Sequence, residues 1–282
     1  MGSKEKYWVR LPDQHRWLLK VARGNEHDEV ISGEDWAEYT VHHLASLLGV
    51  PTATVRPALY DGRRAIVSRS VLREDGLQAL VHGNELLAGR DPAYDPQLRG
   101  NNPRYTLNAV HDVLDEVSPP NESEWPANLT AFDVWAGYLI LDAWVAGRDR
   151  HHENWAVIRT GDRQSLAPSF DHGNALGFQE RDAKRERMLS DPALFTRWLD
   201  RGTSPHFAGR PHLVDLAHDA VGLASASARR HWEERLAGVS PCRCASIIES
   251  IPSHIMSEVA RTFVSEVLVE NRRRILDGYA TR

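Results

Sequence analysis

The chain has 282 residues, 41% of them hydrophobic, which is enough for one large domain or two smaller domains with buried cores. Its formal net charge is −5 at pH 7, so no general positive field exists to attract nucleic acid. The longest apolar stretch, residues 132–147, is too short for a membrane span and carries two aspartates. No secretory leader opens the chain, and its two cysteines are too close together for an easy disulfide. We therefore expect a cytoplasmic protein that binds neither nucleic acid nor membranes.

The first elements in chain order are two strands and a helix. Residues 6–22 predict two strands joined by a turn at Pro12, because apolar positions alternate on the second strand. Residues 32–50 predict a helix, because their apolar residues fall on one face. Ser32 is the predicted cap at its start, and Gly49 is predicted to end it.

A β-hairpin and a long loop are predicted next. Residues 52–72 contain two β-rich runs around Asp61-Gly62, a residue pair that favours a tight hairpin turn. Pro57 cannot donate a hydrogen bond to a sheet, so the first run is expected at a sheet edge. Residues 73–131 show little periodicity, and their turn-rich part at 89–106 predicts a loop.

The second half of the chain is predicted to be mostly helical. Apolar periodicity indicates helices at 130–146, at roughly 212–237 and at 244–279. One interruption, residues 154–173, predicts a β-hairpin that turns at Gly161. A small α/β part followed by a larger helical part indicates an α+β fold with two lobes and a cleft between them.

A dense polar cluster at residues 147–154 follows the apolar helix, which contains Asp142 as an expected support for this loop. The hairpin after the cluster should bring its two outer ends together, so that Asn154 and Asp171 become neighbours. An amide oxygen and a carboxylate suit Mg²⁺ better than zinc. Asp149 is then free to act on a substrate hydroxyl. Protein kinases use the same three groups: a base aspartate, an asparagine metal ligand and a second aspartate on the metal.

Phosphoryl transfer also needs positive charge next to the phosphates of the nucleotide. Lys20 interrupts a hydrophobic strand, which is the expected place for a lysine that reaches into a cleft. Glu34, Asp35 and Glu38 on the following helix are three candidates for its ion-pair partner. Residues 2–6 add one glycine and two lysines before the first strand, a pattern that indicates a short phosphate-binding loop.

These motifs resemble the HipA-like serine/threonine kinase family. The catalytic segment of that family reads N-x-D-x-H-x-x-N followed by L-x-P-x-[YF]-D, and residues 147–171 contain G-R-D-R-H-H-E-N and L-A-P-S-F-D. Residues 2–6 are similar to the G-x-Q-x-K phosphate loop of the family, with Lys4 at the position of the glutamine. The resemblance covers most of residues 2–180. Three further segments match in order: L-L-K-V-A at the nucleotide lysine, the early helix at 33–51 and the inter-lobe strand at 65–72.

The resemblance implies a two-lobed, protein-kinase-like α+β fold with ATP and Mg²⁺ as cofactors. It implies an N-lobe at residues 1–72 and a helical C-lobe at 73–282, with the catalytic loop at 147–154 and a metal-binding segment at 166–173. The implied catalytic and metal-binding residues are Asp149 as the base, His151 beside the transferring phosphate, and Asn154 and Asp171 as magnesium ligands. The implied nucleotide-binding residues are Gly2, Ser3, Lys4, Lys6, Lys20, Glu38, Ser68 and Arg69, the last two at the hinge beside the adenine.

The expected acceptor is a serine or threonine hydroxyl of a protein, as in the family. A fold and a motif do not fix the acceptor, however, and the long segment at 73–131 could cover a compact ligand. Phosphorylation of a small-molecule hydroxyl is therefore an alternative. A nucleotide-binding regulator without turnover is a second alternative.

Overall fold

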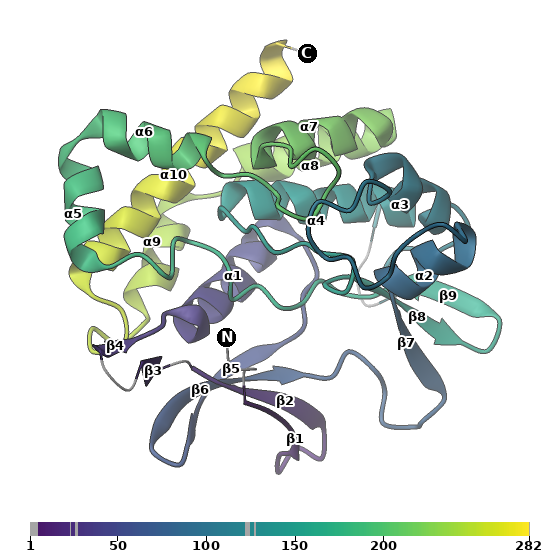
Figure 1. The fold of residues 1–282 in the computed structure, drawn as a ribbon, viewed down its shortest axis with the longest axis horizontal. Coiled ribbons are helices and arrows are strands. Elements are labelled where there is room, and N and C mark those ends of the chain that lie inside the picture. Colours follow the sequence, from purple (N-terminus) through teal and green to yellow (C-terminus); the bar gives the residue numbers. More distant parts are fainter. Residues whose placement is uncertain (1–4, 23, 26–27, 122–124, 127, 282) are drawn as a thin grey trace.

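The computed structural model is an α+β fold with a small β-sheet lobe and a larger helical lobe (Figure 1). This arrangement confirms the predicted fold class. The structure describes residues 5–22, 24–25, 28–121, 125–126 and 128–281. Three residues of the predicted phosphate loop, Gly2, Ser3 and Lys4, lie outside these ranges.

The small lobe is built on a four-stranded antiparallel sheet, and both predicted hairpins are present in it. Pro57 lies on an edge strand, as predicted, where no neighbour needs its missing N–H. The spatial order of the main sheet is β1 (Lys6–Arg10), β2 (Arg16–Val21), β6 (Arg63–Arg69) and β5 (Val55–Tyr60). The strands β3 (Gly24–Asn25) and β4 (Asp28–Ile31) form a separate two-stranded sheet.

Helix α1 (Glu34–Leu48) ends at Gly49, as predicted, but Ser32 does not cap its start. The residue at the cap position is Gly33, which has no side chain to accept a hydrogen bond from the first turn. The reason is steric: a Cβ atom on Gly33 would lie 2.2 Å from Nε1 of Trp36, so the close packing of the indole requires glycine there. The predicted start of the helix was therefore wrong by one residue.

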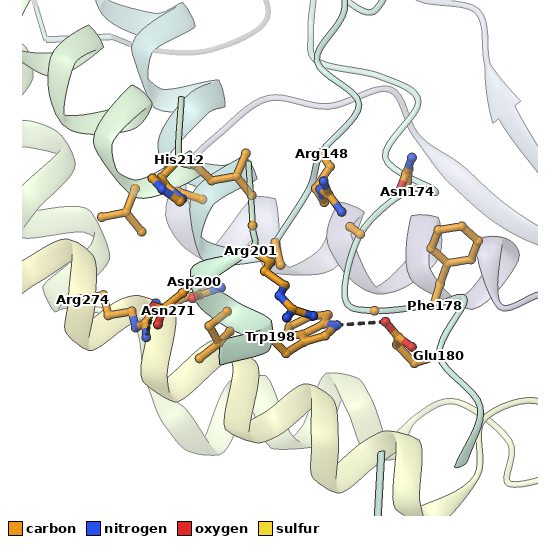
Figure 2. A pocket seen from close by; sticks show the side chains of 18 of the residues that line it. Arg148, Asn174, Phe178, Glu180, Trp198, Asp200, Arg201, His212, Asn271 and Arg274 are labelled. Carbon is orange, nitrogen blue, oxygen red and sulfur yellow. Dashed lines mark hydrogen bonds and ion pairs between the residues drawn. The ribbon is translucent and has the colours of Figure 1, made fainter. Parts of the chain in front are cut away.

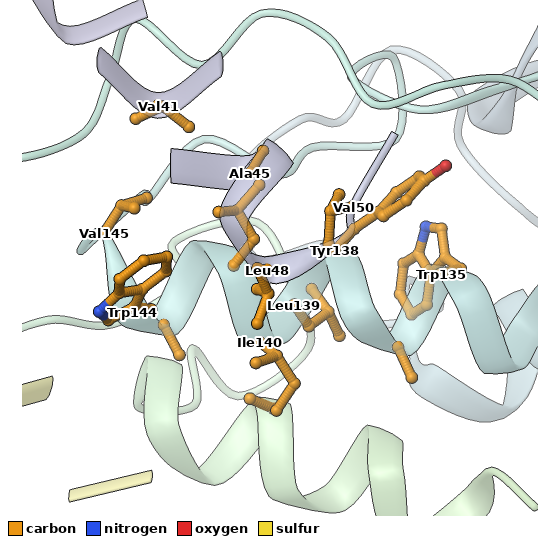
Figure 3. Packing of buried hydrophobic residues seen from close by; sticks show 14 of the residues in the cluster. Val41, Ala45, Leu48, Val50, Trp135, Tyr138, Leu139, Ile140, Trp144 and Val145 are labelled. Atoms are coloured by element: carbon orange, nitrogen blue, oxygen red, sulfur yellow. The ribbon is translucent and has the colours of Figure 1, made fainter. Parts of the chain in front are cut away.

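The main hydrophobic core joins α1 to helix α4 (Ala131–Trp144), whose residues are all buried. This burial explains the long apolar stretch of the sequence, because α4 runs through the centre of the larger lobe. Figure 3 shows the contact, to which both helices and the residues that follow them contribute. The labelled members are Val41, Ala45, Leu48 and Val50 on one side and Trp135, Tyr138, Leu139, Ile140, Trp144 and Val145 on the other.

Two of the predicted C-terminal helices are interrupted. Ser225 begins a new helix by accepting a hydrogen bond from the backbone N–H of Ala228, so 212–237 forms two helices. Pro252 lies in a second break within the stretch predicted as 244–279. The resulting helices are α7 (Leu213–Leu223), α8 (Ala226–Ala237), α9 (Pro241–Glu249) and α10 (Glu258–Thr281).

Several elements were missed by the sequence patterns. The predicted hairpin after residue 154 is present as β8 (Ala156–Thr160) and β9 (Arg163–Leu166), but β7 (Gln78–His82) adds a third strand beside β8. The missed helices are α2 (Gly83–Arg90), α3 (Leu107–Leu114), α5 (Asp182–Ser190) and α6 (Pro192–Asp200).

None of the helices in the described part of the chain is long and apolar enough to cross a membrane.

Candidate functional site

The polar loop after α4 is held in a sharply turned conformation. Ala146 has a φ of 52°, in the left-handed region that non-glycine residues rarely adopt. The backbone N–H of Gly147 donates to the carbonyl of Asp142 in the helix at 2.7 Å. The turn and this hydrogen bond fix the backbone immediately before Asp149, so the position of its carboxylate is set by the end of α4.

Arg150 connects the loop to the segment that carries Asp171. Its guanidinium forms a bidentate ion pair with Asp142 at 2.7 and 2.8 Å. It also donates to the carbonyl of Asn154 at 2.9 Å and to the hydroxyl of Ser169 at 2.8 Å. Burial raises the pKa of Asp142, and the charge of Arg150 opposes that rise. Arg150 is itself only 5% exposed, so this buried cation fixes the loop against the far end of the hairpin.

Asn154 and Asp171 line one small cavity together with Asp149. The side-chain N–H of Asn154 donates to the backbone carbonyl of Asp149 at 2.7 Å, which leaves its amide oxygen as the atom available to a cation. An amide oxygen and a carboxylate form a donor set that suits Mg²⁺. Among the described residues, no cluster of three or more His, Cys, Asp or Glu forms a metal cage. Two protein oxygens fit a magnesium ion if water or a bound ligand supplies the remaining ligands.

Lys20 forms a buried ion-pair network across the two lobes. Its ammonium lies 2.9 Å from Oε1 of Glu38 and 2.7 Å from Oδ1 of Asp171. Burial alone would lower the pKa of Lys20, but Asp171 and Glu38 outweigh it and raise that pKa. Of the three acidic candidates on α1, Glu38 contacts Lys20, whereas Asp35 pairs with Arg64 at 2.5 Å. The network links strand β2, helix α1 and the segment after β9.

A larger cleft of about 700 Å³ opens beside Lys20. It has a polar end at Lys20, Asn154 and Asp171, and it is wide enough for a nucleotide. The remaining predicted residues on the walls of the cleft are Lys6, Ser68, Arg69 and His151, and the apolar wall includes Leu18, Ala53, Val71, Leu72, Leu80 and Phe170. The guanidinium of Arg69 lies next to the ring of His15, with N–N distances of 2.8 and 3.1 Å.

His151 carries no positive charge at neutral pH. Burial lowers its pKa to about 4, an effect to which His206 adds and which Asp149 opposes. Its Nδ1 accepts a hydrogen bond from the backbone N–H of Glu153 at 3.1 Å. The neutral ring therefore presents an N–H at Nε2 and can only donate a hydrogen bond to a phosphate.

His206 is a site residue that the sequence patterns missed. Its Nε2 lies 2.9 Å from Oδ1 of Asp149, and its Nδ1 lies 2.7 Å from the carbonyl of Arg99. The carbonyl of Arg99 and the carboxylate of Asp149 are both hydrogen-bond acceptors, so each ring nitrogen of His206 faces an acceptor. His206 thus holds one oxygen of Asp149. His206 is 57 residues from Asp149 in the sequence, in a segment without helical or strand periodicity, and no motif points to it.

Comparison with known proteins extends these observations. No protein-family model matches the sequence, and no curated protein matches it. Among solved structures, the chain is similar to the proinflammatory kinase CtkA of Helicobacter pylori, with a TM-score of 0.73 and 18% identity over 100% of this chain and 90% of that one. It is also similar to HipA of Shewanella oneidensis MR-1, solved with HipB and operator DNA of a toxin–antitoxin system.

The second similarity has a TM-score of 0.63 and 11% identity, and it covers 100% of this chain but only 66% of the HipA chain. At these identities the two comparisons establish a shared fold. The kinase-like architecture and the resemblance to HipA-like proteins are confirmed at that level.

Proposed function

We propose that the protein is an ATP- and Mg²⁺-dependent kinase that phosphorylates a serine or threonine hydroxyl of a protein. The observation that carries the proposal is the juxtaposition of Asp149, Asn154 and Asp171 around one cavity, with Lys20 bonded to Asp171 at 2.7 Å. A hydroxyl base, two oxygen ligands for magnesium and a phosphate-neutralising lysine are the groups that phosphoryl transfer needs. The kinase-like fold supports the same conclusion.

Each residue has a distinct role in this proposal. Asp149 accepts the proton of the acceptor hydroxyl, and Lys20 neutralises charge on the nucleotide phosphates. Asn154 and Asp171 would hold Mg²⁺, which when bound neutralises the charge that develops on the transferred phosphoryl group. Catalysis then depends on position and charge, because the reacting groups are held by a rigid loop and a buried network.

Incubation with γ-labelled ATP and cell extract tests the proposal, with and without magnesium. We expect label on serine or threonine of an extract protein, lost when EDTA removes the divalent ion. Label on a small molecule alone would favour a metabolite kinase. Stabilisation of the protein by ATP and magnesium, measured as a thermal shift without any label transfer, would favour a regulator without turnover.

We also propose a cytoplasmic location. Cys242 is exposed and Cys244 is buried, and both are free thiols. Free thiols persist in a reducing compartment. Redox-sensitive labelling of the exposed Cys242 in intact cells would measure this, and an oxidised Cys242 thiol would contradict it.

Replacement of Lys20 with methionine is expected to lower kcat/KM for ATP by about 10²–10³-fold, because a preorganised charge next to the phosphates is lost. Glu38→Gln is the matched comparison. It keeps the contact between Lys20 and Asp171, so a smaller loss of about tenfold is expected. Steady-state kinetics with varied ATP measures kcat/KM for both variants. Equal losses in the two variants would show that Glu38, and not the lysine charge, dominates.

His206→Ala is expected to lower kcat by about 10- to 100-fold, because Asp149 loses the contact that orients its carboxylate. KM for ATP should change little, since His206 does not line the nucleotide cleft. The exposed His254 provides the control, as His254→Ala should leave both constants unchanged. A rise in kcat for His206→Ala would instead mean that the histidine restrains the base.

A further inference from the structure

A second cavity of about 550 Å³ lies in the helical lobe next to the catalytic loop (Figure 2). Asn174 and Ala175 line both this cavity and the small cavity that contains Asp149. Arg148, the residue immediately before Asp149, also lines it. The cavity therefore adjoins the place where an acceptor hydroxyl must lie, and none of the roles described above uses it.

The charges in this cavity are not balanced. Lys184 pairs with Glu180 at 2.6 Å, and Arg274 pairs with Asp200 at 2.9 Å, so these four charges cancel locally. Two further cations, Arg148 and Arg201, line the cavity together with one further carboxylate, Asp215, so the lining carries one more cation than carboxylates. In the part of the chain that the structure describes, no carboxylate lies within 4.0 Å of either guanidinium.

Arg148 is held in place without being neutralised. Its Nε donates to the carbonyl of Thr203 at 3.1 Å, and a terminal nitrogen lies 3.5 Å from the hydroxyl of the same residue. A guanidinium has five N–H donors, so most of them stay available for an anion. Because one side of Arg148 is fixed, little side-chain entropy is lost when the remaining donors bind a ligand.

The walls of the cavity are rigid, and its rim is open to solvent. The indole N–H of Trp198 donates to Oε1 of Glu180 at 2.9 Å, and the ring packs edge-on against Phe263. Arg201 and Asn174 on the rim are exposed. A rigid cavity with an exposed rim fits a single side chain that reaches in from a polypeptide lying across the surface.

We propose that this cavity, the arginine pocket, binds an acidic side chain of the protein acceptor through Arg148 and Arg201. The inference rests on the proposed function and specifies its substrate class: a serine or threonine with a nearby aspartate or glutamate. Arginine and carboxylate form strong, charge-assisted hydrogen bonds, and Trp198 supplies an apolar wall for the stem of the side chain. Arg148 precedes Asp149 directly, so the acidic residue lies only a few positions from the acceptor.

Phosphosite mapping in a cell extract, with the wild type and two charge reversals, tests the pocket. Arg201→Glu changes the exposed pocket residue. Arg197→Glu is the matched control, because Arg197 is exposed on helix α6, which ends immediately before Arg201, but does not line the pocket. Degenerate serine and threonine peptide libraries then give kcat and KM for glutamate, glutamine or lysine at each flanking position. Thermal unfolding checks that both variants are folded.

The wild type is expected to label sites enriched in nearby acidic residues and to prefer glutamate over glutamine peptides by about tenfold, mainly through KM. Arg201→Glu should lose this preference or reverse it towards lysine, and Arg197→Glu should keep it. Labelled sites without acidic enrichment, an unchanged preference in Arg201→Glu, or label on small molecules alone would overturn the inference. Absence of transfer from ATP to any acceptor would refute the proposed function itself.

Discussion

Asp149→Asn is expected to reduce phosphoryl transfer by about 10²–10⁴-fold and to leave the affinity for magnesium and ATP nearly unchanged. Asparagine keeps the size of the side chain and an oxygen that can accept the hydrogen bond from His206. It cannot take a proton from a hydroxyl, because an amide is not a base at neutral pH. Lys20, Asn154 and Asp171 keep their contacts, so nucleotide binding should persist.

Single-turnover rates and calorimetric titration with ATP and magnesium measure the two halves of this expectation. Asp162→Asn is the matched control, since Asp162 is exposed at the turn between β8 and β9. Turnover within tenfold of the wild type in Asp149→Asn would remove this residue from the role of base. Loss of ATP binding in the same variant would mean that it also organises the nucleotide site.

Arg150→Met is expected to lower the free energy of unfolding by about 3–5 kcal/mol, because Asp142 would be left as a buried carboxylate without its cation. The carbonyl of Asn154 and the hydroxyl of Ser169 would lose their donor at the same time. Asn154 and Asp171, on the two sides of the proposed metal site, both depend on this residue, so activity should fall together with stability. Urea denaturation followed by circular dichroism measures the free energy change.

The double variant Asp142→Leu with Arg150→Met separates stability from function. Replacement of a buried ion pair by apolar residues of similar size is often neutral or stabilising. We expect the double variant to regain most of the lost free energy of unfolding without regaining activity. If Arg150→Met alone loses less than about 1 kcal/mol, water reaches the pair and the carboxylate is not truly buried.

The central part of the site could be predicted from sequence because it depends on local geometry. A turn at Gly161 with β-rich runs on both sides requires that Asn154 and Asp171 meet, and they line one cavity in the structure. The partner of Lys20 was not determined in this way, since Glu34, Asp35 and Glu38 all lie near one end of α1. Only the family resemblance selected Glu38 before the structure placed it 2.9 Å from Lys20.

The residues that other segments bring close to Asp149 were beyond sequence patterns for a physical reason. His206 and Arg201 come from a segment without regular secondary structure, whose path depends on contacts with distant residues. The carbonyl of Pro205, for example, accepts from the backbone N–H of Asn101 at 2.7 Å. Neither hydrophobic periodicity nor turn chemistry encodes such pairings, so Asp149 could be found by its motif while its partner could not.

Helices α5 and α6 were missed for a related reason. Helix α5 is strongly charged and has few buried residues, so it gives a weak apolar pattern. Its position depends on long-range contacts, such as the packing of Met188 in one cluster with Phe263 and Val267 of α10. By contrast, α4 is buried all round and was visible as a continuous apolar run.

The burial of α1 in the core of the larger lobe limits how this protein can be switched. Val41, Leu44 and Leu48 are fully buried, and pulling the helix outward would expose them at a cost of about 1.5–3 kcal/mol each. Withdrawal of Glu38 from Lys20 by a swinging helix is therefore not an accessible off-state. Separation of Lys20 from Glu38 would instead require the β-sheet lobe, which carries Lys20 on β2, to move relative to α1.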